Sequence, residues 1–156
     1  MADRSSGAAA PADRTLVIRR VFDASQDLVF ESWANPEHAI RWWGPKDFTV
    51  PSLELDARVG GAWRAHMRSP EGKDYRQHGV VREIVRPHRL VFTFIWDEEP
   101  DHEMLVTVTF TDRGGKTEVH FRQDGFHSVE ERDSHREGWS ECFDRLETFL
   151  ADRGAK

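Results

Sequence analysis

Cysteine is nearly absent from this 156-residue chain: Cys142 is the only one, so no disulfide can form within the chain. No uninterrupted apolar run has the length needed to span a bilayer. Residues 1–14 lack the apolar central stretch of a secretion signal, and their Ala, Ser, Gly and Pro content predicts a disordered tail. Together these absences predict a cytoplasmic protein without a membrane span.

The chain also lacks the surplus of cations that a nucleic-acid-binding protein needs to neutralise phosphates, because its formal net charge is −6. Its arginines are scattered among acids, which indicates a mixed, solvated surface. Hydrophobic residues make up 38% and charged residues 32% of the chain, as in an ordinary globular domain. We therefore expect one domain, over residues 15–152. Six tryptophans and ten phenylalanines give it an unusually aromatic core.

The first part of this domain is expected to form one strand and two short helices. Residues 15–22 are rich in β-branched side chains, which favours a strand. Residues 26–34 follow helix-capping residues, and a second helix starts at Asn35-Pro36 and must stop at Gly44-Pro45. Trp42 and Trp43 lie at this helical corner. Either both indoles pack on a sheet, or they are exposed and one of them gates a pocket or contacts a partner.

From Val50 onward the apolar residues recur with a period of two, which predicts strands. Short turns join them, so they should form an antiparallel meander with one apolar, aromatic face. The pattern of residues 75–85 is too mixed to decide whether Glu83 faces inward. The expected strands are residues 52–56, 62–68, 75–85, 90–96, 103–112 and 117–123.

The last element is a long helix that starts after Ser128 and ends near Gly154. Its apolar residues fall at helical spacing and form one continuous stripe, with His135 at the N-terminal end. A helix laid in the concave side of a bent sheet would bury both surfaces. The sequence thus predicts an α+β fold with a long C-terminal helix over a curved antiparallel sheet.

Four segments carry a resemblance to a known family: residues 21–45, 55–72, 79–94 and the HREGW sequence of 135–139. In this order they resemble the bacterial single-domain members of the Activator of Hsp90 ATPase homologue family, within the START-like (SRPBCC) superfamily. The resemblance implies the helix-grip fold with an apolar cavity between sheet and helix. The eukaryotic activators carry a further N-terminal domain for which this chain has no room, so we do not expect a chaperone interaction.

An apolar cavity of this kind is the usual form of a small-molecule site. His135 could orient a ligand or anchor the helix to a strand, and an inward Glu83 would need a partner or a raised pKa. Cys142 is expected to be a buried hydrophobe and not a nucleophile. The histidines lack zinc-motif spacing, so no metal or other cofactor is expected. The predicted ligand-binding residues are Trp63, Met67, Tyr75, Glu83, Phe92, Phe94, Trp96, Val108, Phe121, His135, Trp139 and Phe143.

The sequence leaves three functions open. The first is non-catalytic binding of a small hydrophobic or aromatic molecule or a lipid. The second is a cyclase or hydrolase on the same fold, which would need a convergent acid/base pair in the pocket. The third is a protein-interaction module of the co-chaperone kind. A homodimer is also compatible with the sequence.

Overall fold

A computed structural model describes residues 11–154, which form a seven-stranded antiparallel sheet with three α-helices. The strands are arranged in the order β1-β7-β6-β5-β4-β3-β2, and the predicted meander is confirmed. The strands are β1 (Thr15–Phe22), β2 (Thr49–Leu55), β3 (Ala62–Arg68), β4 (Asp74–Val85), β5 (Arg89–Trp96), β6 (Met104–Arg113) and β7 (Lys116–Asp124). The helices are α1 (Gln26–Ala34), α2 (Pro36–Trp42) and α3 (Val129–Gly154).

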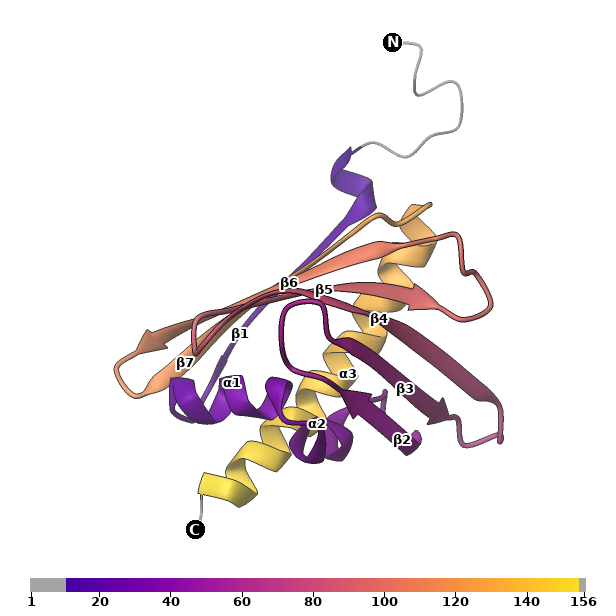
Figure 1. The fold of residues 1–156 in the computed structure, drawn as a ribbon. Coiled ribbons are helices and arrows are strands. Elements are labelled where there is room, and N and C mark those ends of the chain that lie inside the picture. Colours follow the sequence, from indigo (N-terminus) through magenta and orange to yellow (C-terminus); the bar gives the residue numbers. More distant parts are fainter. Residues whose placement is uncertain (1–10, 155–156) are drawn as a thin grey trace.

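The sheet is strongly curved, and α3 crosses it with α1 and α2 beside its C-terminal half (Figure 1). The two short helices begin at capping residues identified in the sequence. The Ser25 hydroxyl accepts a hydrogen bond from the backbone N–H of Leu28, and the Asn35 side chain accepts one from Glu37. Pro36 occupies the first turn of α2, where its missing N–H costs nothing. This is the expected helix-grip fold.

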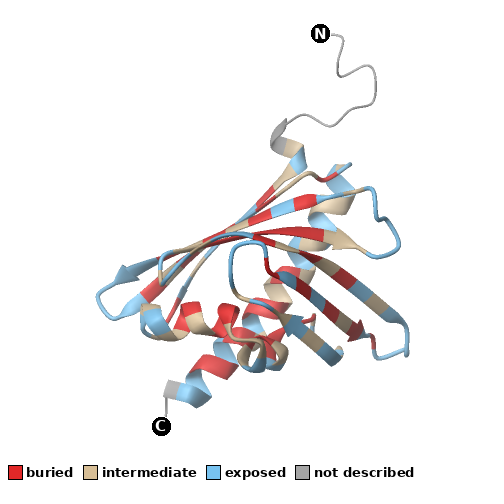
Figure 2. Cartoon of the chain, viewed as in Figure 1, coloured by how far each residue is buried: buried red, intermediate tan, exposed pale blue. Residues whose placement is uncertain are grey.

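Buried residues concentrate on the concave face of the sheet and on the facing sides of the helices (Figure 2). In β3 the predicted alternation is observed, because Trp63, Ala65 and Met67 are buried while Arg64 and Arg68 are exposed. The stripe of α3 is also buried over most of its length: Trp139, Cys142, Phe143, Leu146, Phe149 and Leu150.

Gly79 in β4 permits a close crossing between the core and the sheet. The indole nitrogen of Trp63 donates a 2.8 Å hydrogen bond to the carbonyl oxygen of Thr93 on β5. A Cβ atom at position 79 would collide with both that carbonyl and the indole. Glycine is therefore required where the Trp63 ring passes over β4 to reach β5.

The disordered tail predicted over residues 1–14 extends too far, because its last four residues are ordered against the domain. Residues Pro11–Arg14 form a single 3-10 turn, and the Arg14 carbonyl accepts hydrogen bonds from the backbone of Gly125 and Phe126. Asp13 also lies 3.6 Å from the guanidinium of Arg132 on α3. The other residues of the predicted tail, 1–10, lie outside the described residues.

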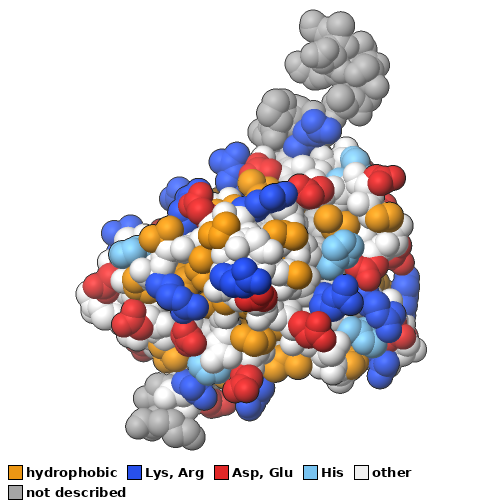
Figure 3. Space-filling view, viewed as in Figure 1, with side chains coloured by type: hydrophobic (Ala, Val, Ile, Leu, Met, Phe, Trp, Pro, Cys, Tyr) orange, Lys and Arg blue, Asp and Glu red, His pale blue; other side chains and the backbone are white. Residues whose placement is uncertain are grey.

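The surface is mixed in charge. On the face seen in Figure 3, Lys and Arg alternate with Asp and Glu, and no broad basic area gathers over one element. Arginines pair with neighbouring acids, as Arg89 does with Glu83 and Arg113 with Glu118. Among residues 11–154, no helix combines the length and apolarity required to cross a membrane.

Candidate ligand-binding cavity

The N-terminal half of α3 stands away from strands β3, β4 and β5 and leaves a cavity of about 240 Å³ between them. The segment after α2 closes one side. The partly exposed Pro45, Phe48 and Tyr75 and the exposed Ser134 contribute to its lining. The whole lining comprises Trp43, Pro45, Phe48, Met67, Tyr75, Gln77, Phe94, Trp96, Ser134, His135, Gly138, Trp139 and Cys142.

Six of the predicted ligand-binding residues lie in this lining, and one predicted gate residue lies there too. The six are Met67, Tyr75, Phe94, Trp96, His135 and Trp139, and the gate residue is Trp43. Gly138 and Cys142 follow His135 by three and seven residues, so their helical spacing was a signal for the same face. Pro45 and Phe48 had no such signal, because the loop after α2 follows no period.

The other predicted ligand-binding residues lie elsewhere. Trp63 and Phe92 line a second cavity of about 30 Å³. Val108, Phe121 and Phe143 are fully buried in solid core. The Phe143 ring packs at 5.6 to 6.2 Å, between centroids, from the rings of Phe22, Trp33 and Phe121. The cavity-facing part of α3 therefore ends at Cys142, and Phe143, which was predicted to bind the ligand, belongs to the core.

Glu83 is not a cavity residue. It is exposed on the outer face of the sheet, where its carboxylate pairs with Arg89 at 2.6 Å. The pairing of β4 with β5 shifts between Val81 and Glu83, as in a β-bulge. Arg82 and Glu83 are consequently both exposed, and Ile84 returns to the apolar side. Without this extra residue, Glu83 would share the face of Val81.

Trp42 and Trp43 are both buried, so the interpretation of an exposed tryptophan pair is wrong. Trp42 belongs to the core, and its indole nitrogen donates to the Ser32 carbonyl at 3.0 Å. Trp43 is shared by the linings of both cavities. Its indole nitrogen donates to the side-chain oxygen of Gln77 at 3.0 Å.

Gln77 is the principal polar group of the cavity that sequence reasoning missed. It is buried, although Arg76 and His78 beside it in the sequence are polar and give no sign of an inward face. Its oxygen is occupied by Trp43, which leaves the amide nitrogen as the donor. The only hydrogen bond of that nitrogen in the described structure goes to the sulfur of Met67, at 3.8 Å. The thioether sulfur is a weak acceptor and can engage only one of the two amide hydrogens, so at least one N–H of Gln77 is available to a ligand.

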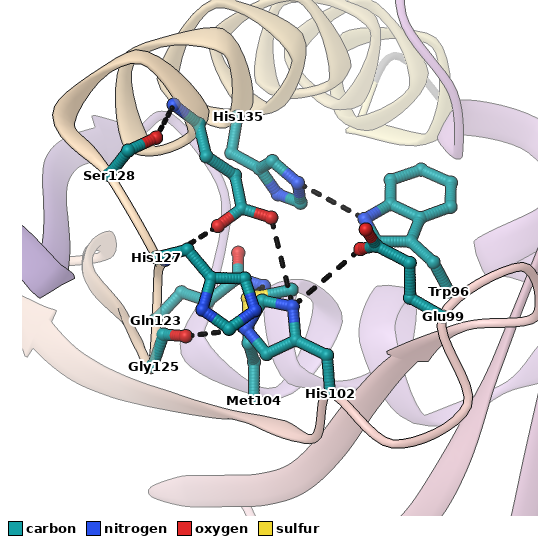
Figure 4. Close-up of polar contacts among 10 residues, drawn as sticks. Trp96, Glu99, His102, Met104, Gln123, Gly125, His127, Ser128 and His135 are labelled. Atoms are coloured by element: carbon teal, nitrogen blue, oxygen red, sulfur yellow. Dashed lines mark hydrogen bonds and ion pairs between the residues drawn. The ribbon is translucent and has the colours of Figure 1, made fainter.

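His135 forms a hydrogen bond with Trp96, and both residues belong to the cavity lining. The indole nitrogen of Trp96 donates to Nε2 of His135 at 3.1 Å (Figure 4), and the rings of Phe94 and Phe126 pack edge-on against the imidazole. Burial lowers the pKa of His135 from 6.5 to about 4, with a smaller contribution from the nearby His102. The imidazole is therefore neutral at physiological pH.

Cys142 lies in the lining, but its thiol is poorly suited to nucleophilic chemistry. Burial raises its pKa to about 12, although a backbone hydrogen bond from Gly44 acts in the opposite direction. A reactive cysteine needs a thiolate near neutral pH. No carboxylate, Lys or Arg contributes to the lining among the described residues.

Comparisons with known proteins agree with this architecture. The sequence model of the family described as Activator of Hsp90 ATPase homolog 1-like protein matches residues 23–151. No curated protein matches the chain. Protein NE0264 from Nitrosomonas europaea is 22% identical with a TM-score of 0.81, over 94% of this chain and 100% of that one. Protein CV1439 from Chromobacterium violaceum is 24% identical with a TM-score of 0.81, over 88% and 96%.

A third solved structure, the AHSA1 protein from Silicibacter pomeroyi, is 25% identical with a TM-score of 0.80, over 89% of this chain and 99% of that chain. These structures share the fold over nearly their full length, and the family model spans most of the domain. The chain therefore belongs to the Activator of Hsp90 ATPase homolog 1-like family and has its START-like fold.

Proposed function

We propose that the protein binds a small aromatic molecule in the cavity between α3 and strands β3–β5, without catalysing a reaction. The observation that carries this proposal is the lining itself: aromatic and apolar side chains surround the space and one buried amide faces it. Ligand sites usually combine such an apolar lining with a few polar groups that fix orientation.

The cavity volume limits the ligand. At about 240 Å³ it is smaller than the roughly 300–1,000 Å³ typical of pockets for drug-sized molecules. One or two aromatic rings would fill it. The ring of Phe94 already packs edge-on against those of Trp96 and Trp139, and a planar ligand could continue this arrangement.

The polar groups suggest what the ligand carries. Gln77 offers an N–H donor, so a ligand oxygen that accepts a hydrogen bond would be favoured there. The Tyr75 side chain lines the same space and is only partly buried. Since the described lining residues include no Asp, Glu, Lys or Arg, a neutral phenol or carbonyl compound fits better than an anion or cation.

The cyclase or hydrolase alternative receives less support from the same residues. It needs a convergent acid/base pair, and the titratable groups of the lining are a neutral His135, a high-pKa Cys142 and Tyr75. His135 Nε2 is already engaged by Trp96, which reduces its availability as a base.

Gly138 offers a direct test of cavity binding. It lies in α3 at the cavity, and a Cβ atom there would touch only Pro45, at an ordinary 3.8 Å. Gly138→Ala should therefore fold and be more stable by up to about 1 kcal/mol, because alanine favours helix. Gly138→Leu would place a larger side chain in the cavity and should block binding.

The measurement is a fluorescence titration with 2-naphthol, a neutral two-ring phenol, checked by the shift in melting temperature. We expect saturable binding by the wild type and Gly138→Ala, and a loss of at least about tenfold in Gly138→Leu. Gln77→Leu should bind more weakly by roughly threefold to tenfold, the value of one hydrogen bond. Equal affinity of all four proteins would contradict binding in this cavity.

The family description also names activation of a chaperone ATPase, which this chain is not proposed to perform. Adding the protein to an Hsp90 ATPase assay provides the check. A reproducible acceleration would favour the protein-interaction alternative over the ligand-binding proposal.

A further inference from the structure

Three side chains of types that can ligate a metal lie close together outside the cavity, where the loop 97–103 reaches the start of α3. Glu99 and His102 come from that loop, between β5 and β6, and Glu131 comes from the first turn of α3. One ligand-type atom from each residue lies within 4.8 Å of the other two. Figure 4 shows Glu99 and His102 side by side below His135. We name these three residues the loop–helix cluster.

His102 has one buried ring nitrogen that the surrounding described residues do not supply with a hydrogen-bond partner. Its side chain is only 10% exposed, and its Nε2 lies 2.6 Å from the carbonyl oxygen of Gly125. A carbonyl oxygen can only accept, so Nε2 must carry the hydrogen. The other ring nitrogen, Nδ1, is buried and has no hydrogen-bond partner in the described structure. A buried polar atom without a partner is uncommon in folded proteins.

That orphaned nitrogen is aimed at two carboxylates. Nδ1 of His102 lies 3.6 Å from Oε1 of Glu99 and 3.8 Å from Oε2 of Glu131. Both separations are too long for hydrogen bonds. Since Nε2 already carries a hydrogen, Nδ1 either holds a proton that pairs with the two carboxylates or offers its lone pair to a cation that they also bind. A metal ion between the three atoms would place one positive charge in direct contact with all of them.

We propose that Glu99, His102 and Glu131 bind a divalent transition-metal ion of the Zn²⁺ type, which ties the loop 97–103 to the first turn of α3. One imidazole nitrogen and two carboxylate oxygens are ordinary zinc ligands, with a water as the fourth. Ligand atoms at 2.0–2.2 Å from a tetrahedral zinc lie about 3.3–3.6 Å apart. The observed 3.6 and 3.8 Å approach these values before any metal-induced adjustment.

Groups around the cluster hold two of the three ligands in place. The Nε2–H of His102 donates to Gly125, as metal-binding histidines commonly do with their second nitrogen. Oε1 of Glu131 accepts a 2.7 Å hydrogen bond from the backbone N–H of His127, which leaves Oε2 for the cluster. The ring of His127 stacks on His102 at 3.6 Å between centroids. Glu99 has a 55% exposed side chain and can move the short distance needed.

The proposal opposes the expectation from sequence that no metal site exists. Glu99 and His102 are three residues apart in a loop, and Glu131 follows 29 residues after His102, so no motif spacing reveals the cluster. Only the approach of the β5–β6 loop to α3 brings these residues together.

The test uses the full-length protein, freed of metal with a chelator, and Zn²⁺ alone as the probe. Calorimetric titration should show one equivalent of Zn²⁺ per chain, with a rise in melting temperature. Glu99→Gln removes one charged ligand at an exposed position, so the fold should be retained. Its affinity should fall by at least about tenfold, and that of His102→Gln by more.

Glu98→Gln is the matched control, because Glu98 is an exposed carboxylate of the same loop outside the cluster. It should bind Zn²⁺ as the wild type does. Replacing Zn²⁺ with Co²⁺ should add visible absorption of a tetrahedral site in the wild type and not in His102→Gln. Absence of saturable binding at one equivalent, or equal affinity of Glu99→Gln and Glu98→Gln, would overturn the proposal.

Discussion

The Nε2 atom of His135 on α3 accepts a 3.1 Å hydrogen bond from the indole nitrogen of Trp96 on β5, across the wall of the cavity. This bond requires an unprotonated Nε2. Protonation would break it and place a charge against the rings of Phe94 and Phe126. The neutral state of His135 is therefore part of the folded arrangement of the cavity.

A pH dependence of stability follows from this arrangement. Unfolded chains take up a proton on His135 as the pH falls through 6.5, whereas burial delays that uptake in the folded protein until about pH 4. Between these values the unfolded state binds more protons, so stability decreases as the pH decreases. The contribution of His135 to this loss is up to about 3 kcal/mol.

Urea unfolding at pH 7 and pH 4.5 measures this effect, with His135→Gln as the comparison. Glutamine does not titrate, and its amide oxygen can still accept from Trp96. The wild type should lose more stability than His135→Gln over this interval. A parallel decrease in the two proteins would show that His135 is not buried in its neutral form.

Two Trp–Gln pairs with the same chemistry allow a matched comparison of core and cavity. Trp139 donates at 2.9 Å to Gln123, which is fully buried outside the cavity lining, and Trp43 donates at 3.0 Å to Gln77, which lines the cavity. Gln123→Leu should cost about 2 kcal/mol, because the Trp139 N–H is left buried without a partner. Gln77→Leu should cost less, since water in the cavity can replace the lost acceptor. Urea denaturation midpoints provide the comparison, and equal losses would argue against an accessible cavity.

Cys142 should be chemically inert in the folded protein. Burial raises the pKa of its thiol to about 12, so almost no thiolate is present at pH 8. A chromogenic disulfide reagent should therefore react very slowly with the native protein and rapidly after unfolding in guanidinium chloride. Rapid labelling of the native protein would instead indicate an accessible, activated thiol and would revive the catalytic hypothesis.

Much of the fold could be predicted because its elements carry simple periods. The alternation of Trp63, Ala65 and Met67 identified both a strand and its inner face. The stripe of α3 and the caps at Ser25 and Asn35 likewise placed the helices. These signals are local, so they can be recognised before the tertiary contacts are known.

The residues that were misplaced depend on features without a period. The bulge in β4 inserts one residue, which moves Glu83 to the outer face. Gln77 is polar but buried, because its partner Trp43 lies 34 residues away in the chain. Phe143 follows Trp139 by about one helical turn on the same stripe of α3, and only the distance between α3 and the sheet at each point, a tertiary property, separates core from cavity.

The most direct test of the central claim is a nitrogen–proton NMR spectrum, in which the side-chain indole N–H groups of the six tryptophans can be followed separately while 2-naphthol is added. Trp43, Trp96 and Trp139 line the cavity, whereas Trp42 is fully buried in core outside it. Binding in the cavity predicts large shifts for the first three indole signals and little change for Trp42. Saturable shifts of Trp42 without those of Trp43 and Trp96, or no shifts at all, would contradict the account.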